Sequence, residues 1–458
     1  MAKYPFEPYK IKVVEPINIT TRQEREHLLK KYGYNLFAIP AKYVTIDLLT
    51  DSGTSAMSQN QWAGLMLGDE SYAGCVNYYH LEETVKEITG YKEVIPVHQG
   101  RAAENLLFSI LVKKGDVVVN NTHFDTTGAN VNYKGGISLN LPIKEGMDPD
   151  SLFPFKGNMD IERLEEVIKE YGAEKIPLCI MTVTNNSVAG QPVSMENIKQ
   201  VRKILDKYNI PLFFDAARYA ENSYFIKQRE KGYKDKSISE IAREMFSYGD
   251  GCLMSAKKDG LVNIGGILAL NDRELAQRLR ELMVIFEGFP TYGGLAGRDL
   301  EAIAIGLKEA QDERYLESRI NQVRYLAEVL KENNIPIYMP PGGHAVYINA
   351  KRFLPHIPQS QFPGQSLVVA LYLEAGIRAV EIGSVMFAKK DPETGEIKYP
   401  ELELVRLAIP RRVYTRSHID YVAETIIKLY EKRDRLKGMR YTYEPPHLKH
   451  FLARFDFV

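Results

Sequence analysis

The chain has 458 residues, of which 45% are hydrophobic and 26% are charged, so it can bury a sizeable core and is expected to form two or three domains. Lysine plus arginine and aspartate plus glutamate both total 59, so no net charge attracts nucleic acid or an anionic membrane. Cys75, Cys179 and Cys252 are too far apart to suggest a disulfide framework or a thiolate metal site. A small-molecule partner is therefore favoured.

The chain start carries prolines and a glutamate where a signal peptide would have an apolar core, and no run of about 18 apolar residues occurs. We expect neither export nor a membrane span. A reducing cytoplasm fits the cysteine content best.

Taken in chain order, the first 40 residues are polar and proline-rich, and we interpret them as an arm or a segment that contacts a partner. Between about residues 81 and 270, short apolar runs alternate with longer amphipathic segments, which is typical of a mainly parallel sheet covered by helices. The predicted strands are 93–97, 116–119, 177–183, 211–215, 251–255 and 266–270, and the predicted helices between them are 160–171 and 194–208. Asp160 and Ser194 are suitable N-terminal caps for these helices.

Long helices rich in glutamate, arginine and lysine are expected over 298–333, and short strands such as 345–348 and 402–409 follow them. The sequence thus predicts an α/β fold with a second, smaller α+β domain. We assign residues 1–55 to the arm and part of the small domain, 56–310 to the large domain, and 311–458 to the rest of the small domain.

Polar residues that end apolar strands are the first functional candidates, because a doubly wound sheet binds its ligand beyond the carboxyl ends of its strands. The run at 210–214 leads into Asp215 and Arg218, and the run at 251–254 leads into Ser255, Lys257 and Lys258. A lysine in a cleft can become a nucleophile that forms a Schiff base. The alternatives are a structural ion pair for Asp215 and Arg218, and a solvated turn for the two lysines.

A third candidate is the stretch 94–104, which reads as an apolar strand, a glycine turn and the start of a helix. Gly100 would let the backbone approach a phosphate, helix amides would bind it, and Arg101 could add a charged contact. The stretch has neither a dinucleotide-binding nor a Walker pattern. A phosphate cradle, then a strand-end carboxylate, then a strand-end lysine is the set that pyridoxal phosphate needs, and their order is that of the aspartate-aminotransferase-like fold.

The chain resembles the β-eliminating lyase family shared by tyrosine phenol-lyase and tryptophanase over essentially its whole length. The motifs that carry this resemblance are IDLLTDSGT at 46–54, GDESYAG at 68–74, HQGR at 98–101, GQPVS at 190–194, SAKKD at 255–259, GGL at 293–295 and GGHA at 342–345. The resemblance implies a large domain of fold type I, the pyridoxal-phosphate-dependent transferase-like fold, with a mainly parallel or mixed sheet.

By the same resemblance, Lys258 rather than Lys257 is the Schiff-base residue, a choice that spacing alone leaves open. The cofactor-binding residues implied are Gln99, Gly100, Arg101, Phe124, Asn186, Asp215, Arg218, Ser255 and Lys258. Core packing is the alternative role for Phe124. For Asp215 and Arg218, the implied partners are the ring nitrogen and the phenolic oxygen of the cofactor.

The resemblance also implies a substrate site, a cation site and a homotetramer. The substrate residues are Thr50, Ser52, Asn186, Ile382 and Arg406, with Tyr72 as an acid near the leaving ring. Potassium or ammonium would bind at Glu70 and at the backbone carbonyls of Gly53 and Asn263. An internal salt bridge is the alternative role for Arg406, and simple packing is the alternative for Tyr72.

Three positions favour tryptophan over tyrosine as the substrate. The tyrosine-cleaving enzymes have threonine, arginine and phenylalanine where this chain has Asp125, Ile382 and His450. Ile382 cannot hydrogen-bond a phenol, whereas Asp125 and His450 suit the acceptor and proton-handling roles that an indole needs, so both are catalytic candidates. A surface histidine near a chain end is the alternative for His450.

The stretch LVNI at 261–264 instead matches the tyrosine-cleaving enzymes, so cleavage of tyrosine to phenol, pyruvate and ammonia stays as the first rival. A non-catalytic protein of the same fold is the second. An NAD-dependent oxidoreductase is the third, and the missing glycine fingerprint argues against it.

Overall fold

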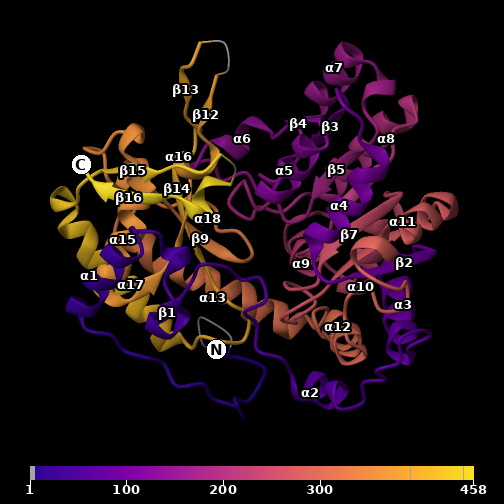
Figure 1. Ribbon diagram of the computed structural model, residues 1–458, viewed down its shortest axis with the longest axis horizontal. Coiled ribbons are helices and arrows are strands. Elements are labelled where there is room, and N and C mark those ends of the chain that lie inside the picture. The colour runs from indigo at the N-terminus through magenta and orange to yellow at the C-terminus, as the bar shows by residue number, and fades with distance from the viewer. Residues whose placement is uncertain (1–5, 392–393, 447) are drawn as a thin grey trace. The chain divides into compact units, whose positions relative to one another are not determined.

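The computed structural model describes residues 6–391, 394–446 and 448–458 (Figure 1). The chain divides into two compact units, which we call the large unit, residues 52–148 and 153–317, and the small unit, residues 1–51, 149–152 and 318–458. The segment 149–152 belongs to the small unit although it lies inside the range predicted for the large domain.

The large unit is built on a seven-stranded sheet with the order β2-β8-β7-β6-β5-β3-β4. Its strands are β2 (Glu93–Val97), β3 (Val117–Asn120), β4 (Ile137–Asn140), β5 (Cys179–Thr182), β6 (Leu212–Asp215), β7 (Gly251–Ser255) and β8 (Gly266–Leu270). β8 pairs antiparallel with both β2 and β7, and the remaining pairs are parallel. The carboxyl ends of β2, β3, β5, β6 and β7 therefore lie at one edge of the sheet.

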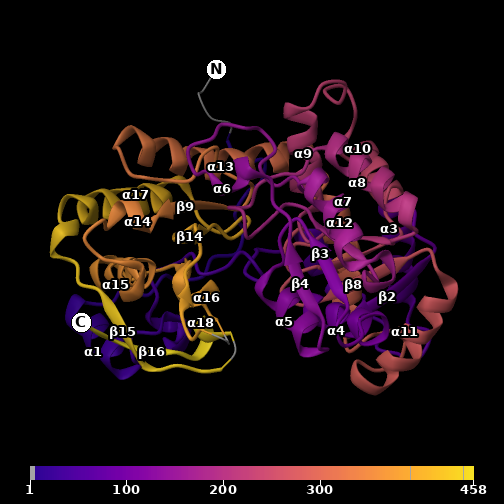
Figure 2. The same ribbon diagram turned by 90° about the horizontal axis from the view of Figure 1, so that it is seen from above.

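Helices cover both faces of this sheet, with α4, α5 and α11 on one face and α7, α8 and α10 on the other (Figure 2). The helices of the large unit are α2 (Gln59–Leu65), α3 (Val76–Thr89), α4 (Gly100–Leu111), α5 (Asp125–Tyr133), α6 (Lys144–Met147), α7 (Ile161–Tyr171), α8 (Met195–Tyr208), α9 (Tyr219–Arg229), α10 (Ile238–Ser247), α11 (Arg273–Phe286) and α12 (Gly297–Glu309), with the short 3-10 helix η3 (Ala173–Lys175). As predicted, Asp160 and Ser194 cap α7 and α8, because their side chains accept hydrogen bonds from the backbone N–H groups of Arg163 and Asn197.

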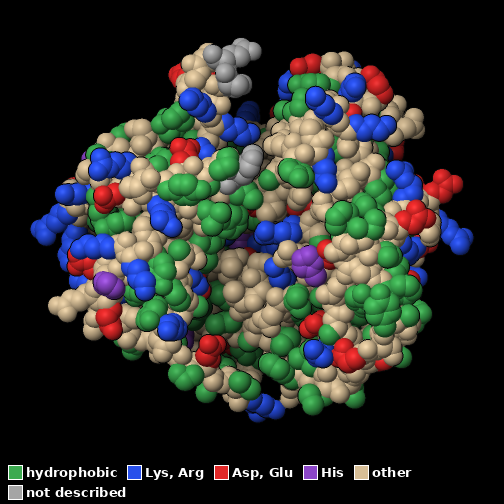
Figure 3. Space-filling view, in the orientation of Figure 1, with side chains coloured by type: hydrophobic (Ala, Val, Ile, Leu, Met, Phe, Trp, Pro, Cys, Tyr) green, Lys and Arg blue, Asp and Glu red, His purple; other side chains and the backbone are tan. Residues whose placement is uncertain are grey.

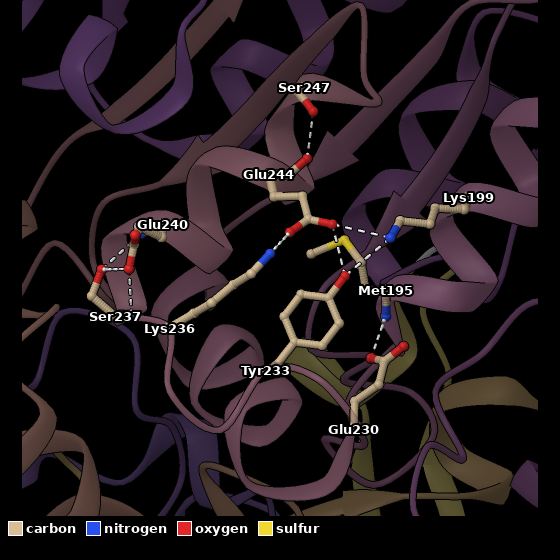
Figure 4. Close-up of polar contacts among 9 residues, drawn as sticks. All are labelled: Met195, Lys199, Glu230, Tyr233, Lys236, Ser237, Glu240, Glu244 and Ser247. Atoms are coloured by element: carbon tan, nitrogen blue, oxygen red, sulfur yellow. Dashed lines mark hydrogen bonds and ion pairs between the residues drawn. The ribbon is translucent and has the colours of Figure 1, made fainter.

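A polar network around Glu244 joins α8 to α10 on the outside of the large unit (Figure 4). The Glu244 carboxylate accepts hydrogen bonds from Tyr233 at 2.7 Å and Lys236 at 2.6 Å, and it pairs with Lys199 at 3.1 Å. Burial alone would raise the pKa of Glu244, but these donors outweigh it and lower the pKa to about 2. Glu230 accepts from the Met195 N–H at 2.7 Å and so holds the start of α8 in the same network.

The small unit has a three-stranded antiparallel sheet with the order β11-β14-β9 and several two-stranded pairs. Its strands are β1 (Ile46–Asp47), β9 (Ala345–Asn349), β10 (Ile377–Arg378), β11 (Val380–Ile382), β12 (Lys389–Lys390), β13 (Ile397–Lys398), β14 (Leu404–Ala408), β15 (Met439–Tyr443) and β16 (Arg454–Phe457). Its helices are α1 (Arg22–Lys31), α14 (Ala350–Phe353), α15 (Pro363–Ala375), α16 (Ser384–Phe387), α17 (Arg416–Glu431) and α18 (Lys449–Leu452), with the 3-10 helices η1 (Leu36–Ala38), η2 (Ala41–Tyr43), η4 (Gln359–Gln361) and η5 (Arg433–Arg435); α13 (Glu313–Glu332) begins in the large unit and continues into the small one.

The predicted α/β fold is confirmed, and each of the six predicted strands of the large sheet is present. The elements that were not predicted include β4, α1, α3, α9, α10 and α11. Figure 3 shows lysine and arginine side chains interspersed with aspartate and glutamate over the face that it draws, in keeping with the balanced composition. Within the described residues, no helix is both long and apolar enough to cross a membrane.

Candidate active site

A glycine turn lies where β2 leads into α4. Gln99 is the N-cap residue of α4, and Gly100 is packed so closely on Ser255 that an added Cβ would stand 2.8 Å from the Ser255 Cβ. The Ser255 hydroxyl is buried and has no hydrogen-bond partner among the described residues. A buried hydroxyl beside helix amides suits a phosphate oxygen, so this turn fits the predicted phosphate cradle.

Lys257 lies at the same turn as a positive group. Its ammonium donates a hydrogen bond to the Gln99 Oε1 atom at 3.3 Å. Burial and the charge of Arg101 lower the pKa of Lys257, because a neighbouring cation disfavours the charged ammonium. Two cationic side chains at this turn suit a phosphate group.

Asp215 and Lys258 interact electrostatically at the carboxyl ends of β6 and β7. Burial raises the pKa of Asp215. The charge of Lys258 opposes this rise most, and a hydrogen bond from the Ala217 N–H and the charge of Arg218 oppose it to a smaller extent. Arg218 is buried at the start of α9. The structure thus brings a strand-end carboxylate and the predicted Schiff-base lysine together, which spacing in the sequence could not establish.

The turn that carries Lys258 is fixed by the next residue, Asp259. Its buried carboxylate accepts hydrogen bonds from the N–H groups of Ala220 at 2.8 Å and Glu221 at 3.2 Å, at the start of α9. The Lys258 carbonyl accepts from the Leu261 N–H at 2.9 Å. Asp259 was not predicted to have a role, because it lies 38 to 39 residues from the N–H groups that it caps and so leaves no local capping signal in the sequence.

A second fixing contact, between His98 and Glu287, was also missed. The Glu287 carboxylate accepts from the His98 N–H at 3.0 Å and lies 2.5 Å from the His98 Nδ1 atom. It anchors the backbone directly before Gln99. No local pattern joins the two residues.

The loops after β3 and β5 carry Phe124, Asp125 and Asn186. The Ser187 hydroxyl donates to the His123 carbonyl at 3.0 Å and so links the two loops. Phe124 and Asp125 are half-buried at the start of α5, whereas Asn186 is buried. These side chains therefore lie at the same sheet edge as Asp215.

The residues predicted for the cation site fall into two groups. The Gly53 carbonyl accepts a hydrogen bond from the Asn263 side chain at 2.9 Å, and the neighbouring Ser52 is half-buried. The Glu70 carboxylate instead pairs with Arg298 at 2.9 Å. Among the described residues, no cluster of three or more histidine, cysteine, aspartate or glutamate side chains could hold a metal ion, so the cation site stays a prediction.

Tyr72 is 70% exposed, and its ring lies 5.2 Å from that of Tyr292 and 5.8 Å from that of Phe289. A hydrogen bond with Tyr292 raises the pKa of Tyr72. The exposure argues against burial of Tyr72 within this chain, whereas its ring contacts fit the packing alternative, and its role as an acid stays a prediction.

The remaining predicted residues, Thr50, Ile382, Arg406 and His450, lie in the small unit. Arg406 is buried in β14 and donates to the Leu49 carbonyl at 3.1 Å, next to half-buried Thr50. Ile382 is 3% exposed in β11. His450 is 6% exposed, so the alternative of a surface histidine is wrong, and its helix α18 packs against α16, which follows Ile382.

Two buried carboxylates, Glu381 and Glu403, hold the segment after Ile382. Glu381 accepts from the Val385 N–H at 2.9 Å, and Glu403 accepts from the Ser384 N–H at 2.9 Å and the Ser384 hydroxyl at 2.5 Å. Burial raises the pKa of both groups, and the charge of Glu403 raises that of Glu381 further. The folded chain therefore favours a protonated carboxyl in this pair.

Because the pKa of Glu381 is raised in the folded state, its protonated carboxyl stabilises the fold at pH values below its ordinary pKa of about 4.5. This stabilisation is lost as the pH rises through the folded-state pKa. Glu381→Gln, which stays neutral, is expected to raise the melting temperature at pH 8 by at least about 2 °C and to change it little near pH 4.5. Thermal unfolding at the two pH values measures this difference, with Glu424→Gln, at an exposed position, as the control. Equal effects of Glu381→Gln at both pH values would contradict a protonated pair.

Comparison with known proteins assigns the family. Residues 47–425 match the model of the beta-eliminating lyase family. The chain belongs to the β-eliminating lyase family. It is 54% identical over 450 residues to a tyrosine phenol-lyase of Symbiobacterium thermophilum, covering 98% of both chains, and 55% identical over 447 residues to a tryptophanase of Salinibacter ruber, covering 98% of this chain and 94% of the relative. Tyrosine phenol-lyases of Pasteurella multocida and Clostridium tetani are 54% and 52% identical.

The fold is similar to that of Sphingomonas wittichii serine palmitoyltransferase, with a TM-score of 0.59, 13% identity, and coverage of 90% of this chain and 97% of that one. A second serine palmitoyltransferase structure, with a pyridoxal phosphate internal aldimine, has a TM-score of 0.60 at 13% identity. The predicted fold type I is thereby confirmed, and the β-eliminating lyase family is pyridoxal-phosphate-dependent. Three residues fit this cofactor: Ser255, whose buried hydroxyl has no hydrogen-bond partner in the described part of the chain, and the interacting Asp215 and Lys258.

Proposed function

We propose that this lyase cleaves L-tryptophan to indole, pyruvate and ammonia. The observation that carries the proposal is the nearly complete burial of Ile382, at 3% exposure. The family resemblance implies that position 382 lies beside the leaving ring, where an apolar side chain cannot satisfy a buried phenol hydroxyl, and an unsatisfied buried hydroxyl costs about 1 to 3 kcal/mol. Buried His450 and half-buried Asp125 add the polar groups that an indole leaving group requires.

Cleavage of L-tyrosine to phenol is the second candidate. It is favoured by the names of the relatives, since further proteins 50 to 53% identical to this chain are also called tyrosine phenol-lyase. The tryptophanase relative is equally similar at 55% identity, so overall similarity does not choose between the two substrates. The choice depends on the side chains that would contact the leaving ring.

In the proposed reaction, bound pyridoxal phosphate supplies an electron sink and a covalent attachment point for the amino acid. Gln99, Gly100, Arg101 and Ser255 would bind its phosphate, Phe124 would stack on its ring, and Asp215 and Arg218 would bind its nitrogen and phenolic oxygen. Lys258 would remove the substrate's Cα proton. These roles follow from the family resemblance and from the grouping of these residues at one sheet edge.

We further propose that Arg406, with Thr50, Ser52 and Asn186, binds the substrate carboxylate, since a buried guanidinium suits a bidentate anion. Tyr72, Asp125 and His450 are the candidates for donating a proton to the leaving ring.

A homotetramer with a monovalent cation at Glu70, Gly53 and Asn263 is also proposed. Large apolar side chains of the large unit support an interface with other copies, because Met66, Leu67 and Ile285 are 85%, 76% and 75% exposed. Where exposed apolar side chains form a contiguous patch, the patch marks a contact with another protein.

Purified holoenzyme is expected to release indole from tryptophan at least about tenfold faster, as kcat/KM, than phenol from tyrosine. Ile382→Arg is expected to narrow this ratio, because the added guanidinium can hydrogen-bond a phenol oxygen. Ile382→Leu, which keeps the position apolar, is the matched control. If the unmodified enzyme releases phenol faster than indole, the substrate assignment is wrong.

A further inference from the structure

Glu104 is a buried carboxylate that the proposed reaction does not use. It is 5% exposed on α4, one helical turn after Gly100, so it lies on the same side of the helix as the phosphate cradle. A carboxylate is costly to bury unless it is hydrogen-bonded. Its partners therefore indicate what it does.

Both hydrogen bonds to Glu104 come from α5. The Thr127 hydroxyl donates to its Oε1 atom at 2.5 Å, and the Asn130 amide donates to its Oε2 atom at 3.0 Å. Thr127 is fully buried, so solvent does not compete with its bond. The start of α5 carries Phe124 and Asp125. The hydrogen bonds of Glu104 therefore connect these residues to α4, the helix whose first turn belongs to the phosphate cradle.

The charges that act on Glu104 are those of the site. Burial and the carboxylates of Asp215, at the end of β6, and Asp125, on α5, raise the pKa of Glu104 to about 7, although the hydrogen bonds from Thr127 and Asn130 act to lower it. Asp215 in turn interacts with Lys258 and Arg218.

The other elements that pack on α4 surround it with apolar side chains. These side chains are Ile95 and Val97 of β2, Leu253 of β7, Leu268 and Leu270 of β8, and Leu275, Leu279 and Met283 of α11. They do not add to the charges that act on Glu104.

We propose that Glu104 is a positioning residue that holds the start of α5 against the phosphate cradle. When ionised, Glu104 also stabilises the proton shared between Asp215 and the cofactor's ring nitrogen. A second negative charge near Asp215 stabilises a positive ring nitrogen for the same electrostatic reason that it raises the pKa of a neighbouring acid. The ionised form is the supportive one, so activity rises with pH as Glu104 loses its proton. This role rests on the proposed cofactor contact of Asp215, but it does not depend on whether tryptophan or tyrosine is cleaved.

The test compares three variants of the full-length holoenzyme on whichever of the two substrates the unmodified enzyme cleaves. Glu104→Gln cannot ionise. Its plot of kcat against pH is therefore expected to lose the rise near pH 7, which we call the acid limb. At pH 8 its kcat is expected to be about tenfold lower, a factor that corresponds to one pKa unit. Thr127→Val removes a hydrogen bond that lowers the pKa of Glu104, so it is expected to move the same limb to higher pH. Thr127→Ser restores the hydroxyl and should restore the profile.

The visible absorbance of the bound cofactor, recorded between pH 6 and 9, is a second readout, and it is expected to show the same midpoint in the unmodified enzyme and no midpoint in Glu104→Gln. A residue that only stabilises the α4–α5 contact would lower the melting temperature and leave both pH profiles unchanged. That result, or a flat profile in the unmodified enzyme, would overturn the proposal. If Glu104→Gln does not fold, the shift in Thr127→Val decides. A reversed substrate preference changes neither profile, so failure of the tryptophan proposal is distinguishable.

Discussion

Replacing Lys258 by alanine is expected to lower kcat for β-elimination by about 10⁴-fold or more, because one change removes both the covalent anchor for the cofactor and the base for the Cα proton. It should also remove the visible absorbance band that pyridoxal phosphate gains when its aldehyde binds an amine. The physical basis is the electrostatic interaction of Lys258 with Asp215, which brings the amine into the same site as the carboxylate proposed to bind the ring nitrogen. Turnover and absorbance of the purified variant measure the two effects together.

The adjacent lysine provides a matched control. Lys257 donates to Gln99 at 3.3 Å in the phosphate cradle, so Lys257→Ala is expected to weaken cofactor binding while the absorbance band stays. If instead Lys257→Ala loses the band and Lys258→Ala keeps it, the assignment of the two lysines is reversed. A non-catalytic protein of this fold would show neither effect.

The sheet could be predicted because its strands are short, continuous apolar runs. β5, β6, β7 and β8 are buried along their length, apart from the terminal Asp215, and parallel strands covered on both faces have this pattern. β4 was missed because it lies at the edge of the sheet, and its residues are exposed or half-buried, without an apolar run. α1 was missed because it is strongly polar, although Thr21 and Glu24 form a capping box that marks its start.

The site could be predicted only where residues follow strand ends. Asp215, Ser255 and Lys258 are of this kind, since parallel strands bring their carboxyl ends to one edge. The supporting contacts are different. His98 and Glu287 are 189 residues apart, and Glu104 lies 23 residues from Thr127, so no periodicity or motif in one sequence joins them.

The substrate residues show a further limit. Ile382 and Arg406 are ordinary strand residues by pattern, an isoleucine and a lone arginine in apolar runs, and only the family resemblance singles them out. Their burial was predictable from the runs, whereas their role depends on what each side chain would face. The leaving group that this enzyme releases therefore has to be measured. Sequence similarity does not identify it, because relatives at 54% and 55% identity carry different names.

Replacing Asp215 by alanine has the second largest expected effect, a loss of about 10² to 10³-fold in kcat/KM. Burial raises the pKa of Asp215, and the charges of Lys258 and Arg218 reduce that rise, so the cations of the site favour the ionised carboxylate. Without it, the ring nitrogen has no anionic partner in a buried setting, and the carbanion formed at Cα is less stabilised. Steady-state kinetics with saturating cofactor measure the loss, and Asp215→Glu is expected to recover part of it because it keeps the charge.

The control for Asp215 lies at the opposite edge of the same sheet. Asp250 precedes β7 and accepts hydrogen bonds from Arg202 and from the Leu212 N–H, both at 2.8 Å. Asp250→Asn is expected to cost stability but to leave kcat/KM within about twofold, because a charge that far along the strands from the carboxyl ends does not act on the ring nitrogen. If Asp215→Ala and Asp250→Asn had equal effects on kcat/KM, the carboxylate at 215 would be structural, and the electron-sink role that depends on it would have to be assigned to another group.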